Sequence, residues 1–121
     1  MPRISKVSAS RSPPEAEVLT ARLRSKATDD VEQAVEHYGS EADVEVATRF
    51  VDDLERTIRQ LEAHPELGSL RLAFDLDLPG LRSIRAEAFP YLVFYLIRGE
   101  HLDVLRVLHP SRDVPAMLRD S

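Results

Sequence analysis

Apolar residues are concentrated in the last third of the chain, where three short segments follow one another. Residues 91–97 form an almost unbroken apolar run rich in aromatic and branched side chains, which is typical of a strand covered on both faces. Residues 82–88 alternate between two faces, and residues 102–109 carry a strand's length of β-branched and aliphatic side chains. Because the link at residues 98–101 is short and contains glycine, the last two segments are expected to form an antiparallel hairpin. The pattern predicts a three-strand meander with residues 91–97 at its centre.

A helical periodicity precedes these strands. Apolar side chains recur at i, i+4, i+7, i+8 and i+11 through residues 27–38, which predicts an amphipathic helix. Ser25 and Thr28 are both candidate N-caps, and Asp30 lies near the positive end of the helix dipole. Gly39 is expected to end this helix.

A second amphipathic helix follows at once. The S-x-x-D pattern of residues 40–43 resembles a capping box, and an apolar stripe continues from it as far as Leu61. His64 and the proline after it are expected to end the helix. A link of two or three residues makes the two helices an antiparallel hairpin, and their apolar stripes need a common partner surface, which the strands supply.

Two further segments alternate between apolar and polar residues. Residues 17–23 are predicted to form the first strand, with Leu19, Ala21 and Leu23 facing inward. For residues 69–78 two interpretations stay open: a strand that ends at a proline-glycine turn, or a connecting loop that pins its leucines onto the helices. The predicted order is β-α-α-β-β-β. It defines an α+β fold in which an antiparallel helical hairpin packs on a mostly antiparallel, twisted sheet.

Composition places these elements in one domain. The chain has 121 residues, of which 43% are hydrophobic, so residues 16–121 are predicted to form a single core. Residues 1–15 are rich in serine, arginine and proline, and a disordered leader is expected there. The chain has no cysteine, and its four histidines are not spaced i, i+4, so no metal site is predicted. The formal charge of −5 gives no overall attraction for nucleic acid, and only a local basic patch is compatible with such binding.

Five segments follow the second helix in order: HPELGS, LPGLRS, FPYLVFY, DVLRVLHPSRD and VPAML. Their order and spacing resemble the RelE/ParE superfamily of type II toxin-antitoxin toxins, specifically its ParE-like branch, over about residues 19–118. The resemblance implies the same helical hairpin on a mostly antiparallel sheet, and a loop for much of residues 68–78. The leader is longer than is usual in the family.

The ParE-like resemblance implies that the chain poisons DNA gyrase. Such an activity needs a surface complementary to a protein target and no catalytic constellation, which suits an acidic chain without an evident active site. The candidate target-binding residues lie in the last segment: Arg112, Asp113, Met117 and Leu118. Together with Val114, the same segment is equally compatible with one helical turn that caps the core.

Resemblance to RelE implies an alternative, a metal-independent, ribosome-dependent mRNA endonuclease, which needs an acid, a base and cations for the phosphorane charge. Its candidates are His109 as acid or base, the phosphate clamps Arg82, Arg85 and Arg112, and Tyr91 or Tyr95 as stacking or acid groups. Each has a structural interpretation as well. His109 is placed to hydrogen-bond Asp113, the first two arginines lie on opposite strand faces, and both tyrosines suit packing in the sheet. A third possibility is a non-toxic antitoxin-binding module.

The resemblance also implies a partner, a ParD-like ribbon-helix-helix antitoxin whose disordered tail folds as it wraps the toxin in a hetero-oligomer. A free sheet edge is expected to favour such a partner. The apolar candidates for the groove wall are Val44, Val46, Phe50, Leu54, Leu92 and Phe94. The candidate cations for an acidic tail are Arg82, Arg85 and Arg106. No cofactor and no membrane partner are expected. The protein is expected to be cytoplasmic.

Overall fold

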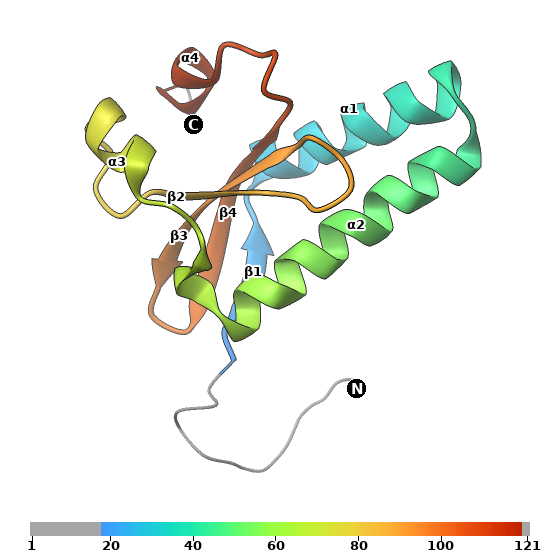
Figure 1. Cartoon of the computed structure of the whole chain (residues 1–121). Helices are drawn as coiled ribbons and strands as arrows, with labels where there is room; N and C mark the ends of the chain where they lie inside the picture. Colours follow the sequence, from blue (N-terminus) through green and yellow to red (C-terminus); the bar gives the residue numbers. More distant parts are fainter. Residues whose placement is uncertain (1–17, 120–121) are drawn as a thin grey trace.

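The computed structural model describes residues 18–119, so the predicted leader at residues 1–15 lies outside the described residues. The elements are β1 (Thr20–Leu23), α1 (Ser25–Glu41), α2 (Val44–Ala63), a 3-10 turn η2 (Pro65–Leu67), α3 (Arg71–Leu76), β2 (Arg82–Arg85), β3 (Leu92–Arg98), β4 (His101–Leu108) and α4 (Val114–Arg119) (Figure 1). The α+β class and the order β-α-α-β-β-β are confirmed. The short helices α3 and α4 are added to that order.

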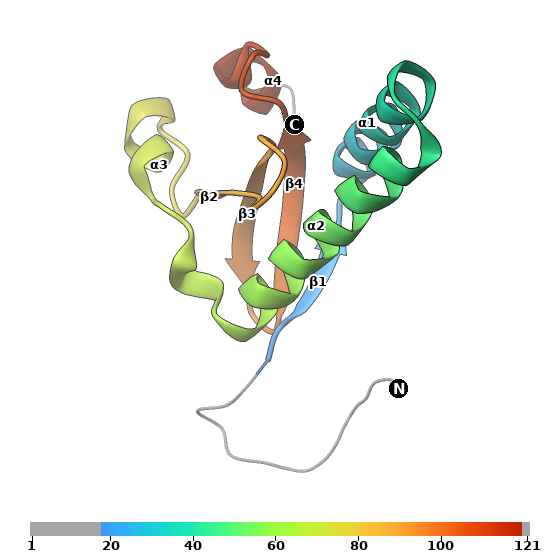
Figure 2. The same ribbon diagram turned by 45° about the vertical axis from the view of Figure 1, so that its right-hand side comes forward.

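The four strands form one sheet in the order β1-β4-β3-β2. β3 runs antiparallel to both of its neighbours, as the meander predicts, and β1 pairs with β4 in the parallel direction at the edge. The hairpin α1–α2 covers one face of the sheet, and α3 and α4 lie on the other side (Figure 2). The first and last strands of the chain are therefore neighbours.

A separate apolar core lies on each face of the sheet. Alternation along β3 sends Val93 and Tyr95 toward the helical hairpin and Phe94 toward the opposite core. All three are fully buried, which confirms that the central strand is covered on both faces. Leu19, just before β1, and Ala21 within it face the hairpin core as predicted. Leu23 is 37% exposed, and its predicted inward position is wrong.

α2 ends as predicted, with Ala63 as its last residue and His64 as its C-cap. The other three predicted helix ends are wrong by a few residues. α1 runs through Gly39 and ends at Glu41, because that glycine faces open space and tolerates a helical position at a cost of about 1 kcal/mol relative to alanine. Its N-cap is Arg24, which makes no side-chain cap hydrogen bond. α2 is capped by Asp43, whose carboxylate accepts the Val46 N–H at 2.9 Å. Ser40 lies in the last turn of α1 and does not open α2.

Residues 69–78 form neither the strand nor the loop of the two predictions. They contain α3, which ends where Asp77 adopts a left-handed conformation with φ of 54°. Leu72 and Leu76 are spaced i, i+4, so the same leucines satisfy a strand period and a helix period. They pack on the core opposite α1–α2, and the expected contact with those helices is wrong.

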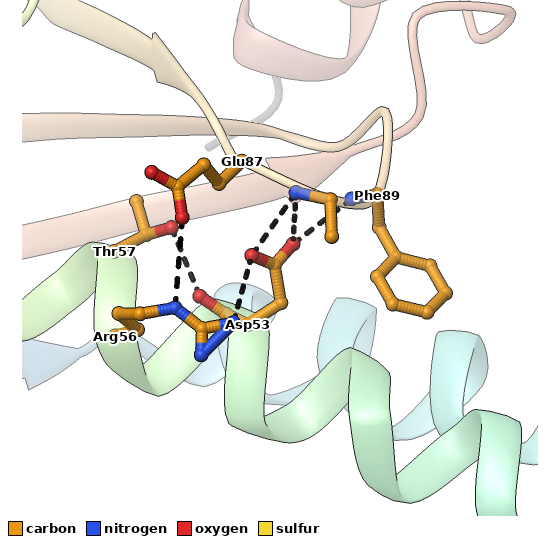
Figure 3. A network of polar contacts seen from close by, with 6 residues as sticks. Asp53, Arg56, Thr57, Glu87 and Phe89 are labelled. Carbon is orange, nitrogen blue, oxygen red and sulfur yellow. Dashed lines mark hydrogen bonds and ion pairs between the residues drawn. The ribbon is translucent and has the colours of Figure 1, made fainter.

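A buried carboxylate of α2 fastens the link between β2 and β3 (Figure 3). Asp53 is fully buried, and it accepts the N–H of Ala88 at 3.1 Å from each oxygen and the N–H of Phe89 at 2.9 Å. Arg56 lies 3.5 Å from that carboxylate and 3.7 Å from Glu87. The link therefore replaces the last residues predicted for the strand at 82–88, since β2 ends at residue 85.

Both edge strands are partly closed by neighbouring backbone or side-chain groups. Glu62 accepts the N–H of Leu19 with its carbonyl at 3.0 Å and the N–H of Ala21 with its carboxylate at 2.8 Å. At the other edge, Ser69 and Ser83 exchange two backbone hydrogen bonds at 2.9 and 3.0 Å. These contacts reduce the backbone edge that is open to an added strand.

Candidate partner-binding groove

A cavity of about 470 Å³ lies on the side of the sheet opposite the hairpin α1–α2. Apolar side chains from β3, β4, α4 and the segment before β2 form its floor: Leu78, Leu81, Leu96, Leu105 and Leu118. Its rim carries the exposed cations Arg24, Lys26 and Arg98. We call this cavity the groove. A leucine floor with a cationic rim suits an amphipathic segment that carries acidic residues.

Asp103 of β4 lies between the arginines of this face. Its side chain is 1% exposed, and one oxygen accepts the Arg22 Nε–H at 2.9 Å. The other oxygen lies 3.4 Å from Arg98 Nε and 3.7 Å from Arg24 NH1. The strand register explains the convergence, because Asp103 is directly opposite Arg22 on one neighbouring strand and Leu96 on the other.

A second cavity, of about 450 Å³, gathers three of the candidate nuclease residues. His109, Arg112 and Tyr91 all line it, together with His37. The Nδ1 atom of His109 accepts the Ser111 N–H at 3.1 Å and lies 2.8 Å from the Ser111 hydroxyl. The prediction that His109 hydrogen-bonds Asp113 is therefore wrong, because its side-chain partner is Ser111.

The other two candidate clamps lie elsewhere. Arg82 donates to the carbonyl oxygens of Gly68 at 2.8 Å and Glu66 at 3.1 Å, which holds the segment before α3. Arg85 is exposed and lines a different cavity, beside Arg56 and other residues of α2. The structure thus brings His109, Arg112 and Tyr91 together and separates all three from the arginines of β2.

Tyr91 and Tyr95 are buried in the hairpin core. The Tyr95 hydroxyl donates to the Pro65 carbonyl at 2.7 Å and accepts the Gly68 N–H at 2.8 Å. Gly68 is required here, because a Cβ at this position would collide with that hydroxyl. Burial raises the pKa of both phenols, so they remain protonated donors at neutral pH.

Among residues 18–119, no three His, Cys, Asp or Glu side chains are grouped so as to hold a metal ion. Across that same range, none of the helices has the length and apolar character that crossing a bilayer requires.

Comparison with protein families identifies a match between residues 21–114 and the ParE toxin of type II toxin-antitoxin system, parDE. The chain belongs to the ParE toxin family. A solved structure described as the chromosomal ParDE TA system from P. aeruginosa matches with a TM-score of 0.64 and 21% identity. The match covers 77% of this chain and 97% of that one, and at this identity it supports the fold. Comparison with curated protein sequences finds no match.

For this ParE-family chain, the candidate target-binding residues divide between surface and core. Arg112 and Asp113 are exposed just before α4. Leu118 is buried and Met117 is half-buried, and both pack with Val114 against the core on this side of the sheet. α4 therefore caps that core, and the exposed part of the candidate surface is reduced to the two charged residues and the outer face of the helix.

The nine residues predicted to bind an antitoxin do not form one surface. Phe50 and Leu54 lie in the hairpin core and Phe94 in the opposite core, since helix and strand alternation turn them away from solvent. Arg106 is buried too, and its Nε lies 2.7 Å from Asp30 of α1. The prediction that these four side chains lie at the surface is therefore wrong.

The remaining predicted antitoxin residues are scattered. Val44 is 75% exposed at the start of α2, Val46 is half-buried in the next turn, and Leu92 is half-buried on the opposite face of the sheet. Arg82 and Arg85 stand at the β2 edge. The groove is lined by other residues, of which only Leu118 was predicted to bind any partner, because the groove forms from segments that are distant in the chain.

Proposed function

We propose that this ParE-family toxin is neutralised by a cognate antitoxin whose tail lies in the groove, and that the free toxin poisons DNA gyrase in the cytoplasm. The observation that carries the antitoxin part is the groove itself. Leu96 and Leu105 present half-buried apolar surface beside exposed cations. An amphipathic helix buries its apolar face in such a surface, while acidic side chains meet the rim.

The groove is tested by co-expression with the antitoxin encoded beside the toxin gene. Leu105→Glu places a charge on the half-buried floor, and Gln60→Glu places the same charge on an exposed position of α2 that does not line the groove. We expect the first variant to lose co-purification of the antitoxin and the second to retain it. Circular dichroism establishes that both are folded. Equal co-purification by both variants contradicts antitoxin binding in the groove.

The gyrase part follows from family membership and from the dispersal of the candidate nuclease residues. His109 and Arg112 share a cavity without the cations Arg82 and Arg85, so fewer groups are available to stabilise a pentacovalent phosphate. Purified toxin is incubated with gyrase and plasmid, and separately with translating ribosomes. We expect inhibited supercoiling and intact mRNA. Cleaved mRNA with normal supercoiling supports the RelE-like alternative.

Expression without the antitoxin separates a toxin from a non-toxic binding module. A gyrase poison arrests growth when it is expressed alone. Unimpaired growth at full expression, together with intact antitoxin binding, overturns toxicity and leaves the binding function standing.

A further inference from the structure

We propose that Asp103, which is paired with Arg22, is a positioning residue that holds the groove-lining arginines Arg24 and Arg98 ready to receive the carboxylates of an acidic partner segment in the groove. The inference rests on the proposed function, because it concerns the same groove. It adds that the rim is ordered before the partner arrives, and that one carboxylate beneath it is responsible.

The contacts of Asp103 support the idea that this buried carboxylate orders the arginine side chains above it. The side chains of Arg22, Arg24 and Arg98 are 52%, 57% and 58% exposed, whereas the Asp103 side chain to which they converge is 1% exposed. The contact with Arg22 is the shortest, through both Nε and NH2 at 2.9 Å from the same oxygen. Long side chains that would otherwise sample many rotamers are therefore anchored by their head groups on this face.

The local charge opposes the charge of the whole chain. The chain carries a formal net charge of −5, yet three arginines surround a single carboxylate here, Arg22, Arg24 and Arg98, and Lys26 lies on the rim of the same groove. A cationic patch on an acidic molecule attracts acidic segments to this one place. Arg24 and Arg98 both line the groove, so the patch is continuous with its apolar floor.

Ordering of the arginine side chains before binding lowers the entropic cost of binding. Immobilising one long side chain at an interface weakens affinity by about two- to tenfold, and this loss is avoided where the side chain is already fixed. Asp103 thus raises affinity through Arg24 and Arg98 without touching the partner. It also reduces the net positive charge of the rim, which slows long-range attraction slightly.

These opposing effects predict a distinctive kinetic result for Asp103→Asn, a change of nearly constant shape. The probe is a synthetic amphipathic helical peptide with leucine on one face and glutamate on the other. With the carboxylate neutralised, the rim is more positive and its arginines are mobile. We expect the association rate at low salt to rise about two- to threefold, and the dissociation rate to rise about tenfold or more.

Two controls define the result. Asp52→Asn removes the same charge from an exposed position on α2 and is expected to leave the dissociation rate unchanged. A peptide with lysine in place of glutamate is expected not to bind. If Asp103 acts only as a structural group, its variant lowers the folded fraction and leaves both rate constants of the folded protein unchanged. That outcome overturns the inference.

Nuclear magnetic resonance of arginine side chains tests the ordering without a partner. In the unmodified protein we expect a slowly exchanging Nε–H resonance from Arg22, which donates to Asp103. Mobile arginines in a protein that binds the glutamate peptide overturn the inference alone. Ordered arginines in a protein that binds neither peptide overturn the proposed groove and the inference with it. This measurement needs no variant, so it decides the matter even where Asp103→Asn does not fold.

Discussion

Removal of the Asp53 carboxylate is expected to destabilise the fold strongly. Asp53 is fully buried, and two backbone N–H groups of the β2–β3 link, from Ala88 and Phe89, donate to it. A hydrogen bond to a charged acceptor contributes about 1.5–3 kcal/mol. Since Ala88 is exposed and water replaces part of its bond, we expect Asp53→Ala to lower the free energy of unfolding by about 2–4 kcal/mol.

Asp53→Asn is expected to cost less, about 1–2 kcal/mol, because one oxygen still accepts an N–H while the charge is lost. The matched control is Asp52→Ala, which removes the neighbouring carboxylate from the exposed side of α2 and is expected to change stability by less than about 0.5 kcal/mol.

Thermal and urea unfolding measure the Asp53 series. For a chain of this length, the expected loss for Asp53→Ala corresponds to a fall in Tm of roughly 10–15 °C. The link also carries Phe89 into ring contacts with Tyr38 and Phe50, at centroid distances of 5.2 and 5.6 Å. Loss of near-ultraviolet dichroism is therefore expected before global unfolding. A variant with alanine at position 53 that is as stable as the Asp52 control would refute the reasoning.

Two further predictions concern other buried polar groups. Arg106→Met leaves Asp30 buried without its bidentate partner, and we expect a loss of about 3–5 kcal/mol in urea unfolding, whereas Arg112→Met at an exposed position is close to neutral. Equal stability of the two variants contradicts this account. Burial raises the pKa of Tyr91 and Tyr95 above the ordinary value of 10.0, so their contribution to stability is complete below pH 10 and is lost as pH rises through the folded pKa. Unfolding free energies and tyrosinate absorbance across this alkaline range test the direction, and a stability that does not fall there contradicts it.

The periodicity of the chain was sufficient for the main elements and insufficient for their ends. The almost unbroken apolar run around Val93 and Tyr95 indicates a strand that is covered on both faces. The position at which a helix ends depends on smaller differences in free energy. Gly39 costs about 1 kcal/mol inside a helix, and the surrounding turns offset this cost. Asp43 and Ser40 are both acceptable caps by residue type, and the structure uses Asp43.

The site was harder to predict than the fold because it depends on contacts between distant segments. Arg106 has the sequence character of an exposed strand cation, and its burial becomes evident only with Asp30 of α1 opposite it. Likewise, nothing in the local pattern distinguishes Asp103 from an ordinary solvent-facing carboxylate. Its importance follows from the register that sets Arg22 beside it. The hydrophobic pattern identifies the faces of helices and strands. The partner of a polar side chain, in contrast, depends on the tertiary structure.

The pairing of β1 with β4 also determines when the sheet of this chain can be completed during translation. Arg22 and Asp103 are separated by 81 positions in the chain. At about 5–20 residues per second, β1 leaves the ribosome roughly 4–16 s before its sheet neighbour. During that interval α1 and α2 can pack against each other. β1, however, has no neighbouring strand to pair with, and the rim of the groove is incomplete. A nascent chain therefore lacks the complete groove that is proposed to bind the antitoxin until nearly all of the chain has been translated.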